Sequence, residues 1–112
     1  MSEQDHLRAG LDLMRRGAYF EAHEELELAW RTATQEERDF FQGLVHVTVA
    51  WYQAGRGNVT GCGRQLEKAA RRLGPYAPEH RGVDVAGLLR QVAAADPSAL
   101  PLPPLEVVEP ER

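Results

Sequence analysis

One segment of the chain places ionisable side chains on the apolar face of an expected helix. At about 100° per residue, Leu26 and Trp30 define that face within residues 19–31. His23 and Glu27 project from inside the same arc, and a buried imidazole or carboxylate there needs a partner. These two side chains therefore either bind a ligand or brace the fold.

The sequence pattern His23-Glu24-x-x-Glu27 resembles part of a metal-binding motif. In zinc hydrolases with His-Glu-x-x-His, two imidazoles one helical turn apart bind the metal and the adjacent Glu acts as the base. Here a carboxylate replaces the second imidazole, and both zinc and di-iron sites accept oxygen ligands. Three readings stay open: a structural pair that sets helix register, a binding site without catalysis, and a divalent-metal enzyme.

The following helix, expected over residues 34–55, offers partners for this pair. Its polar stripe spans an arc of about 60° and consists of Asp39, Gln42, His46 and Gln53. If the stripe faces the preceding helix, Gln42 and His46 converge on the pair. Two imidazoles, one carboxylate and an open position would suit catalytic zinc or non-haem iron, with Glu24 as the base. A closed, hydrogen-bonded arrangement would suit a scaffold.

The apolar spacing predicts an all-α chain. No segment shows the alternation and β-branched enrichment of a strand. Gly17 suits a left-handed helix end, Thr34 with Glu37 suggests a capping box, and Asn58 suggests a cap. The expected helices cover residues 3–16, 19–31, 34–55, 58–73 and 84–94.

A weak internal repeat appears at a shift of 40 residues. Gly17 then aligns with Gly57, and Glu27 with Glu67. The pattern predicts two stacked helical hairpins with tetratricopeptide-like packing, closed by the fifth helix. Residues 1–96 form a single helical domain in this interpretation. Residues 97–112 form an extended Pro-rich tail that lies across the bundle or a neighbouring subunit.

Composition limits the function classes. The longest apolar run, residues 44–52, is far shorter than the roughly 20 residues that cross a bilayer, so no membrane association is expected. The acidic start lacks an export signal, and Cys62 has no second cysteine to pair with, so a cytoplasmic location is expected. The net charge of −4 argues against nucleic-acid binding. The local basic cluster is interpreted as a solvated face and comprises Arg64, Lys68, Arg71 and Arg72.

These motifs together resemble the family known as domain of unknown function 309. The matching stretches are residues 19–24 with Trp30-Arg31, residues 37–44, Gly57-Asn58 and, later, residues 82–84. The resemblance implies an all-α bundle of about five helices and brings no established activity. The family pattern often has Gln where this chain has His46, and His where it has Gln53. These positions are two turns apart on one face, so a fixed ligand set is not implied.

The sequence therefore favours a small cytoplasmic, non-enzymatic module that binds a protein partner or self-associates. Its expected site is a polar seam, and no cofactor is assigned to it. The seam consists of His23, Glu24, Glu27, Trp30, Asp39, Gln42, His46 and Gln53. The alternative is a metal-dependent hydrolase or oxidase with His23, Glu27 and His46 as ligands.

Overall fold

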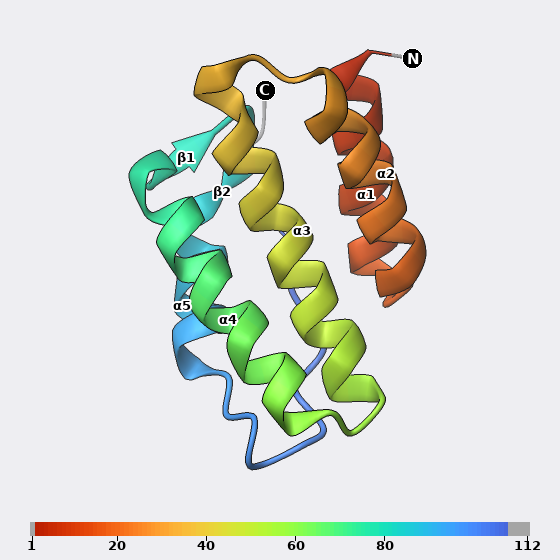
Figure 1. The fold of residues 1–112 in the computed structure, drawn as a ribbon, viewed down its shortest axis with the longest axis vertical. Helices are drawn as coiled ribbons and strands as arrows, with labels where there is room; N and C mark the ends of the chain where they lie inside the picture. Colours follow the sequence, from red (N-terminus) through yellow and green to blue (C-terminus); the bar gives the residue numbers. More distant parts are fainter. Residues whose placement is uncertain (1, 108–112) are drawn as a thin grey trace.

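The computed structural model describes residues 2–107 and confirms the all-α class. Five α-helices account for most of the chain, and a short hairpin of two-residue strands lies before the last helix (Figure 1). The elements are α1 (Glu3–Arg15), α2 (Tyr19–Thr32), α3 (Gln35–Gly55), α4 (Val59–Leu73), a 3₁₀ turn (Gly74–Tyr76), β1 (Glu79–His80), β2 (Val83–Asp84) and α5 (Val85–Ala94).

The helices form two hairpins that pack side by side, as the repeat predicts. Helix α1 packs on α2, α3 packs on α4, and α2 packs on α3, while α5 closes the bundle against α4 (Figure 1). A glycine allows close packing within each hairpin. A Cβ atom on Gly10 would lie 2.8 Å from Cγ of Leu26, and one on Gly43 would lie 2.6 Å from Cγ of Leu73.

Helix boundaries follow local chemistry at most of the expected positions. Gly17 adopts a φ of +78° between α1 and α2, which L side chains rarely adopt. Asn58 caps α4, since its Oδ1 accepts from the N–H of Gly61 at 2.9 Å. The expected capping box at Thr34 is wrong. Thr34 is the N-cap residue of α3, but its side chain makes no cap bond, and the Glu37 side chain, the other half of a capping box, binds His80 and Arg81.

The strands β1 and β2 were not expected from the sequence. They pair antiparallel, with Glu79 opposite Asp84 and His80 opposite Val83. Two residues per strand are too few to show an alternating pattern, which explains the omission. The intervening turn holds Arg81 at a φ of 51°. Tertiary contacts hold this turn, because the Arg81 guanidinium reaches the carboxylates of Glu3 and Glu37.

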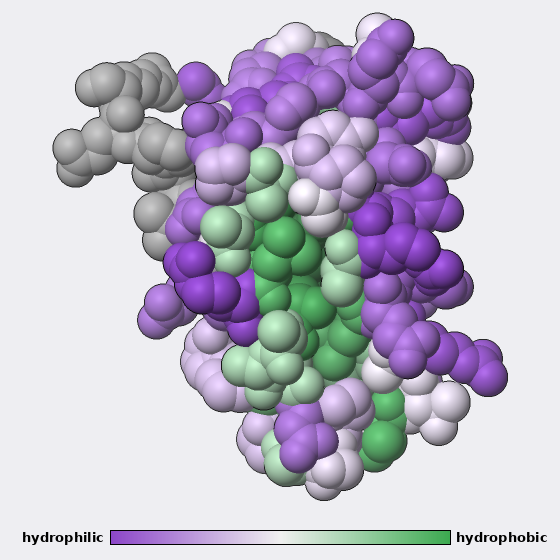
Figure 2. Space-filling model, turned by 90° about the vertical axis from the view of Figure 1, so that its left-hand side faces the viewer, coloured by the Kyte–Doolittle hydropathy of each residue, from purple (hydrophilic) through white to green (hydrophobic). Residues whose placement is uncertain are grey.

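The side of the molecule that carries α5 is not uniformly polar. Figure 2 shows an apolar strip down the middle of this side, bordered on both flanks by hydrophilic side chains. Helix α5 supplies the buried residues Leu88 and Val92, and its Leu89 is only partly buried. Within residues 2–107, no helix is long and apolar enough to cross a membrane.

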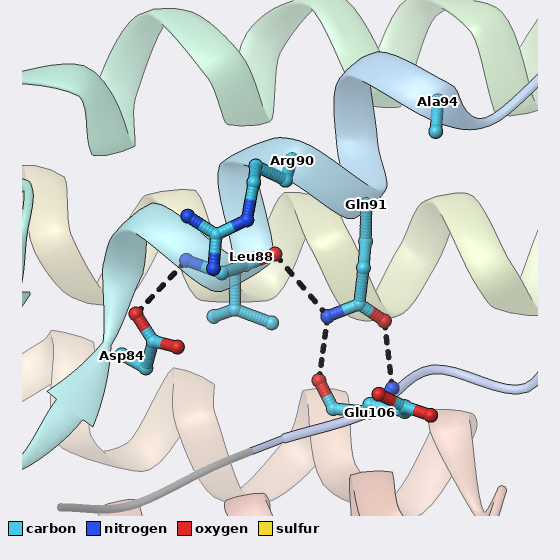
Figure 3. Close-up of a pocket in the computed structure, with 7 residues that line it drawn as sticks. Asp84, Leu88, Arg90, Gln91, Ala94 and Glu106 are labelled. Carbon is cyan, nitrogen blue, oxygen red and sulfur yellow. Dashed lines mark hydrogen bonds between the residues drawn. The ribbon is translucent and has the colours of Figure 1, made fainter.

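The tail after α5 is extended and packs back across the bundle. Leu105 and Val107 are buried, so this segment contributes to the same core as the helices. Side chains from the bundle bind its main chain: Trp51 Nε1 donates to the carbonyl of Pro103 at 2.8 Å, and the N–H of Leu105 donates to the Tyr19 hydroxyl at 3.2 Å. The amide of Gln91 pairs with the tail main chain in the same way (Figure 3). The expectation for residues 108–112 lies outside the described residues.

Candidate functional site

His23 contacts two oxygen atoms of its own helix. Its Nε2 lies 3.1 Å from Oε1 of Glu27, and its Nδ1 lies 3.3 Å from the carbonyl oxygen of Phe20. Both partners accept hydrogen bonds, whereas a neutral imidazole has only one N–H to donate. In a neutral ring only one of these two contacts is therefore a donated hydrogen bond. The Glu27 side chain is 41 % exposed, so this pair lies at the surface of the helix contact and not deep inside it.

His46 lies in a different environment, against α4. It is 8 % exposed, and its Nδ1 lies 2.7 Å from Oε1 of Gln65. Because the Gln65 oxygen accepts, Nδ1 carries the proton and Nε2 accepts from Nε2 of Gln42 at 3.4 Å. Burial lowers the pKa of His46. The Gln65 hydrogen bond opposes this shift, and the positive charges of Arg72, Lys68 and Arg71 add to it.

The structure brings only part of the polar seam together. His23 and Glu27 pair on α2, whereas His46 turns toward Gln65 of α4. Both ring nitrogens of His46 are hydrogen-bonded in this arrangement, Nδ1 to Gln65 and Nε2 to Gln42. Among residues 2–107, no group of three or more His, Cys, Asp or Glu side chains is arranged to hold a metal ion.

Four of the seam residues line one open cleft between α2, α3 and α4. Its volume is about 520 Å³. We call it the Trp30 cleft, and its lining consists of Glu27, Trp30, Gln35, Arg38, Asp39, Gln42 and Arg72. Carboxylates, guanidinium groups and side-chain amides thus surround one space on the polar side of the helix contact.

The charges in the Trp30 cleft are not equally compensated. Arg72 Nη1 lies 2.6 Å from Oδ1 of Asp39, and Glu27 has His23 as its partner. The guanidinium carbon of Arg38 lies 4.3 Å from the ring centroid of Trp30. Among the described residues, Arg38 forms no ion pair with an acidic side chain and no side-chain hydrogen bond, and its guanidinium stacks on the indole of Trp30. Arg38 is therefore positioned by stacking while its N–H donors remain available.

A second, smaller pocket lies along the same pair of helices. Its volume is about 180 Å³. We call it the aromatic pocket, and its lining consists of Tyr19, Phe20, His23, Val49, Tyr52 and Gln53. The Phe20 ring lies 5.5 Å from that of Tyr52 and 5.6 Å from that of His23, centroid to centroid. Phe20 is 47 % exposed and forms an accessible apolar wall.

The remaining seam residues have other positions. Glu24 is exposed and lines neither the Trp30 cleft nor the aromatic pocket. Gln53 lines the aromatic pocket, and its Oε1 accepts from Nδ2 of Asn58 at 3.1 Å. The position of Glu24 gives no support to its expected role as a base beside His23 and His46.

Sequence reasoning missed the cleft residues that carry positive charge. Gln35, Arg38 and Gln42 recur at intervals of three and four on α3 and therefore share a face. That spacing could have indicated that Arg38 lies beside Gln35 and Gln42. No sequence pattern indicated the position of Arg72, because it comes from α4 and reaches the cleft only through the packing of α4 on α3.

A comparison with family models finds one match. The model described as Domain of unknown function (DUF309) matches residues 7–64. The chain belongs to the DUF309 family. The matched region contains most of α1, all of α2 and α3 and the first part of α4, and so includes every residue of the aromatic pocket and all of the Trp30 cleft except Arg72. Neither the comparison with curated proteins nor that with solved structures finds a match.

Proposed function

We propose that this DUF309 protein is a non-enzymatic, cytoplasmic binding module whose Trp30 cleft receives an acidic segment of a partner protein. The observation that carries the proposal is the position of Arg38. Its guanidinium stacks on Trp30 at the cleft and has no acidic partner among the described residues. An incoming carboxylate would supply the missing counter-charge.

The stacked geometry favours a carboxylate over other ligands. A guanidinium presents its N–H donors in a planar fork that fits the two oxygens of a carboxylate, and such charge-assisted bonds are stronger than neutral ones. Stacking on Trp30 limits the rotamers of Arg38 before the ligand arrives, so less side-chain entropy is lost on binding. Tryptophan and arginine are also the residue types enriched in protein-binding hot spots.

The amides in the cleft favour a polypeptide as the carrier of that carboxylate. Gln42 directs its Nε2 toward His46, which leaves its Oε1 as an acceptor for a ligand N–H. The same molecule already shows a glutamine binding an extended main chain, where Gln91 pairs with Glu106. Gln35 is exposed at the cleft and offers a second amide. His46 and Gln65 act here as positioning residues for Gln42.

The metal-dependent alternative finds less support in this geometry. It requires His46 as a ligand together with His23 and Glu27, yet the hydrogen bonds of His46 run to Gln42 and Gln65. A catalytic reading also needs a base at the site, and Glu24 lies outside both cavities. We therefore propose binding and not catalysis.

The test is an NMR titration of the full ¹⁵N-labelled chain with two short probes. These are acetyl-Ala-Ala-Glu-Ala-amide and its neutral analogue, acetyl-Ala-Ala-Gln-Ala-amide. We expect the acidic peptide to shift the Trp30 indole N–H resonance and the α3 amides near Arg38. The neutral peptide should bind about tenfold more weakly, since a charge-assisted bond is lost. Equal affinity for both peptides, or shifts confined to another face, would overturn the proposal.

Two arginine variants test whether the preference for the acidic peptide depends on Arg38. Arg38→Gln should abolish the preference for the acidic peptide. Arg31→Gln is the matched control, because Arg31 is exposed on α2 and lines neither cavity, and it should leave the preference intact. Sedimentation velocity tests whether a second copy of this chain occupies the cleft. Self-association that Arg38→Gln abolishes would identify a second copy of this chain as the ligand and would contradict a separate partner.

A further inference from the structure

The Trp30 cleft and the aromatic pocket lie along the same two helices. On α2, Trp30 lines the cleft and His23 lines the pocket, seven residues and therefore about 10 Å apart along the helix. On α3, Gln42 lines the cleft and Val49 lines the pocket, again seven residues apart. A separation of two turns on both helices keeps the two cavities on one face of the α2–α3 contact.

One side-chain contact joins the two cavities. His23 belongs to the aromatic pocket and Glu27 to the Trp30 cleft, and their side chains meet at 3.1 Å. The two cavities are thus neighbours on this face, one polar around Arg38 and the other apolar around Phe20, with the His23–Glu27 contact between them. An extended ligand that occupies both has to cross this contact.

We propose that the aromatic pocket is a second subsite of the same ligand and accepts one apolar side chain about 10 Å from the acidic group. This inference rests on the proposed function of the Trp30 cleft. The pocket volume of about 180 Å³ is slightly larger than a cavity known to bind benzene, so it suits a single leucine or phenylalanine side chain. Charge complementarity at Arg38 sets which end of the ligand lies in the cleft.

The spacing and the amides together select the ligand conformation. A polyproline II segment rises about 3.1 Å per residue with three residues per turn, so residues i and i+3 lie on one side about 9 Å apart. Its main-chain groups make no internal hydrogen bonds and remain available to Gln35 and Gln42. A helical ligand would already have used those groups. Aromatic-lined grooves are a recurrent way of binding such segments.

The ligand class is therefore an extended segment with an apolar and an acidic residue three positions apart. The probes are acetyl-Leu-Pro-Pro-Glu-amide and acetyl-Ala-Pro-Pro-Glu-amide, titrated into the full ¹⁵N-labelled chain. The reversed pair, with Glu first and Leu or Ala last, tests the other chain direction. We expect the leucine peptide of one direction to bind about tenfold more tightly than its alanine analogue. The extra shifts should fall on residues of the aromatic pocket.

The decisive variant changes Phe20, which lines the aromatic pocket. Phe20→Ala should remove the gain from leucine while leaving the dependence on the glutamate unchanged, because Phe20 does not line the Trp30 cleft. Its exposure of 47 % makes misfolding an improbable cause of the loss. Leu28→Ala is the control: Leu28 is an exposed apolar residue of the same helix, lies outside both cavities and should leave the gain intact.

The outcomes separate the two proposals. If the leucine and alanine peptides bind equally in both directions while the glutamate dependence persists, the second subsite is wrong and the Trp30 cleft stands. If no peptide binds, both proposals fail. A gain from leucine that survives Phe20→Ala would also overturn the assignment to the aromatic pocket.

Discussion

The side-chain amide of Gln91 forms two hydrogen bonds with the main chain of Glu106. Gln91 Nε2 donates to the Glu106 carbonyl at 2.7 Å, and the Glu106 N–H donates to Gln91 Oε1 at 2.8 Å (Figure 3). The arrangement imitates the pairing of two strands, although only one partner is main chain. It holds the tail beside α5 at a position between the buried residues Leu105 and Val107.

The first prediction concerns this pairing. Gln91→Ala removes both of these hydrogen bonds and also the bond of 3.3 Å from Gln91 Nε2 to the Gly87 carbonyl. It should lower the free energy of unfolding by about 1–3 kcal/mol, since a net hydrogen bond contributes about 1 kcal/mol. Urea unfolding measures the loss, and amide hydrogen exchange should accelerate at residues 105–107 before other regions. Arg90→Ala is the control, because Arg90 is an exposed neighbour on α5. Unchanged exchange at residues 105–107 would contradict the role of Gln91.

The second prediction concerns the tight packing of Gly43 of α3 against Leu73 of α4. Gly43→Ala places a methyl group 2.6 Å from Cγ of Leu73 and should cost about 1–3 kcal/mol of stability through overpacking. The double variant with Leu73→Ala should lose less than the sum of the two single variants. A Cβ atom on Gly55, at the end of the same helix, meets nothing within 4 Å. Gly55→Ala should therefore be neutral or slightly stabilising in thermal unfolding.

The third prediction contrasts two acidic residues of α3. Glu37 binds both His80 and Arg81, and its side chain is 22 % exposed. Asp39 binds Arg72, but its side chain is 60 % exposed. Glu37→Ala should cost about 1–3 kcal/mol, because it leaves the partly buried His80 Nε2 without its acceptor and removes one of the two carboxylates that bind Arg81. Asp39→Ala should cost less than about 1 kcal/mol, the usual value of a surface ion pair. Equal losses in urea unfolding would contradict this ranking.

The fourth prediction follows from the lowered pKa of His46. Between that value and the unfolded-state pKa of about 6.5, the unfolded chain binds more protons than the native protein. Stability is therefore fully present above pH ~6.5 and decreases as the pH falls toward the folded-state pKa, by at most about 1.4 kcal/mol per pH unit.

The variant His46→Gln should remove this contribution. The difference in unfolding free energy between wild type and variant should then change between pH 7.5 and pH 5, with the wild type losing more on acidification. Urea unfolding at several pH values measures it. A difference that stays constant over this range would show that His46 does not couple folding to protonation.

Much of the architecture was readable from local sequence. The helices were expected because apolar residues recur at helical spacing, and Gly17 and Asn58 marked boundaries through their own backbone and capping chemistry. The β1–β2 hairpin was not readable, since it depends on Glu37, 42 residues before it, holding the side chain of Arg81 at 3.1 Å.

The candidate site divides in the same way. The sequence by itself determined that His23, Glu27, Gln42 and His46 lie on particular helix faces, because periodicity sets the direction of a side chain around its own axis. Only the tertiary structure decided what those faces meet. The packing of α4 on α3 gave His46 its partner Gln65 and brought Arg72 to the Trp30 cleft. The close packing of side chains from two helices sets how those helices are rotated and shifted relative to each other. The sequence of one helix alone therefore does not determine which residues of its neighbour it meets.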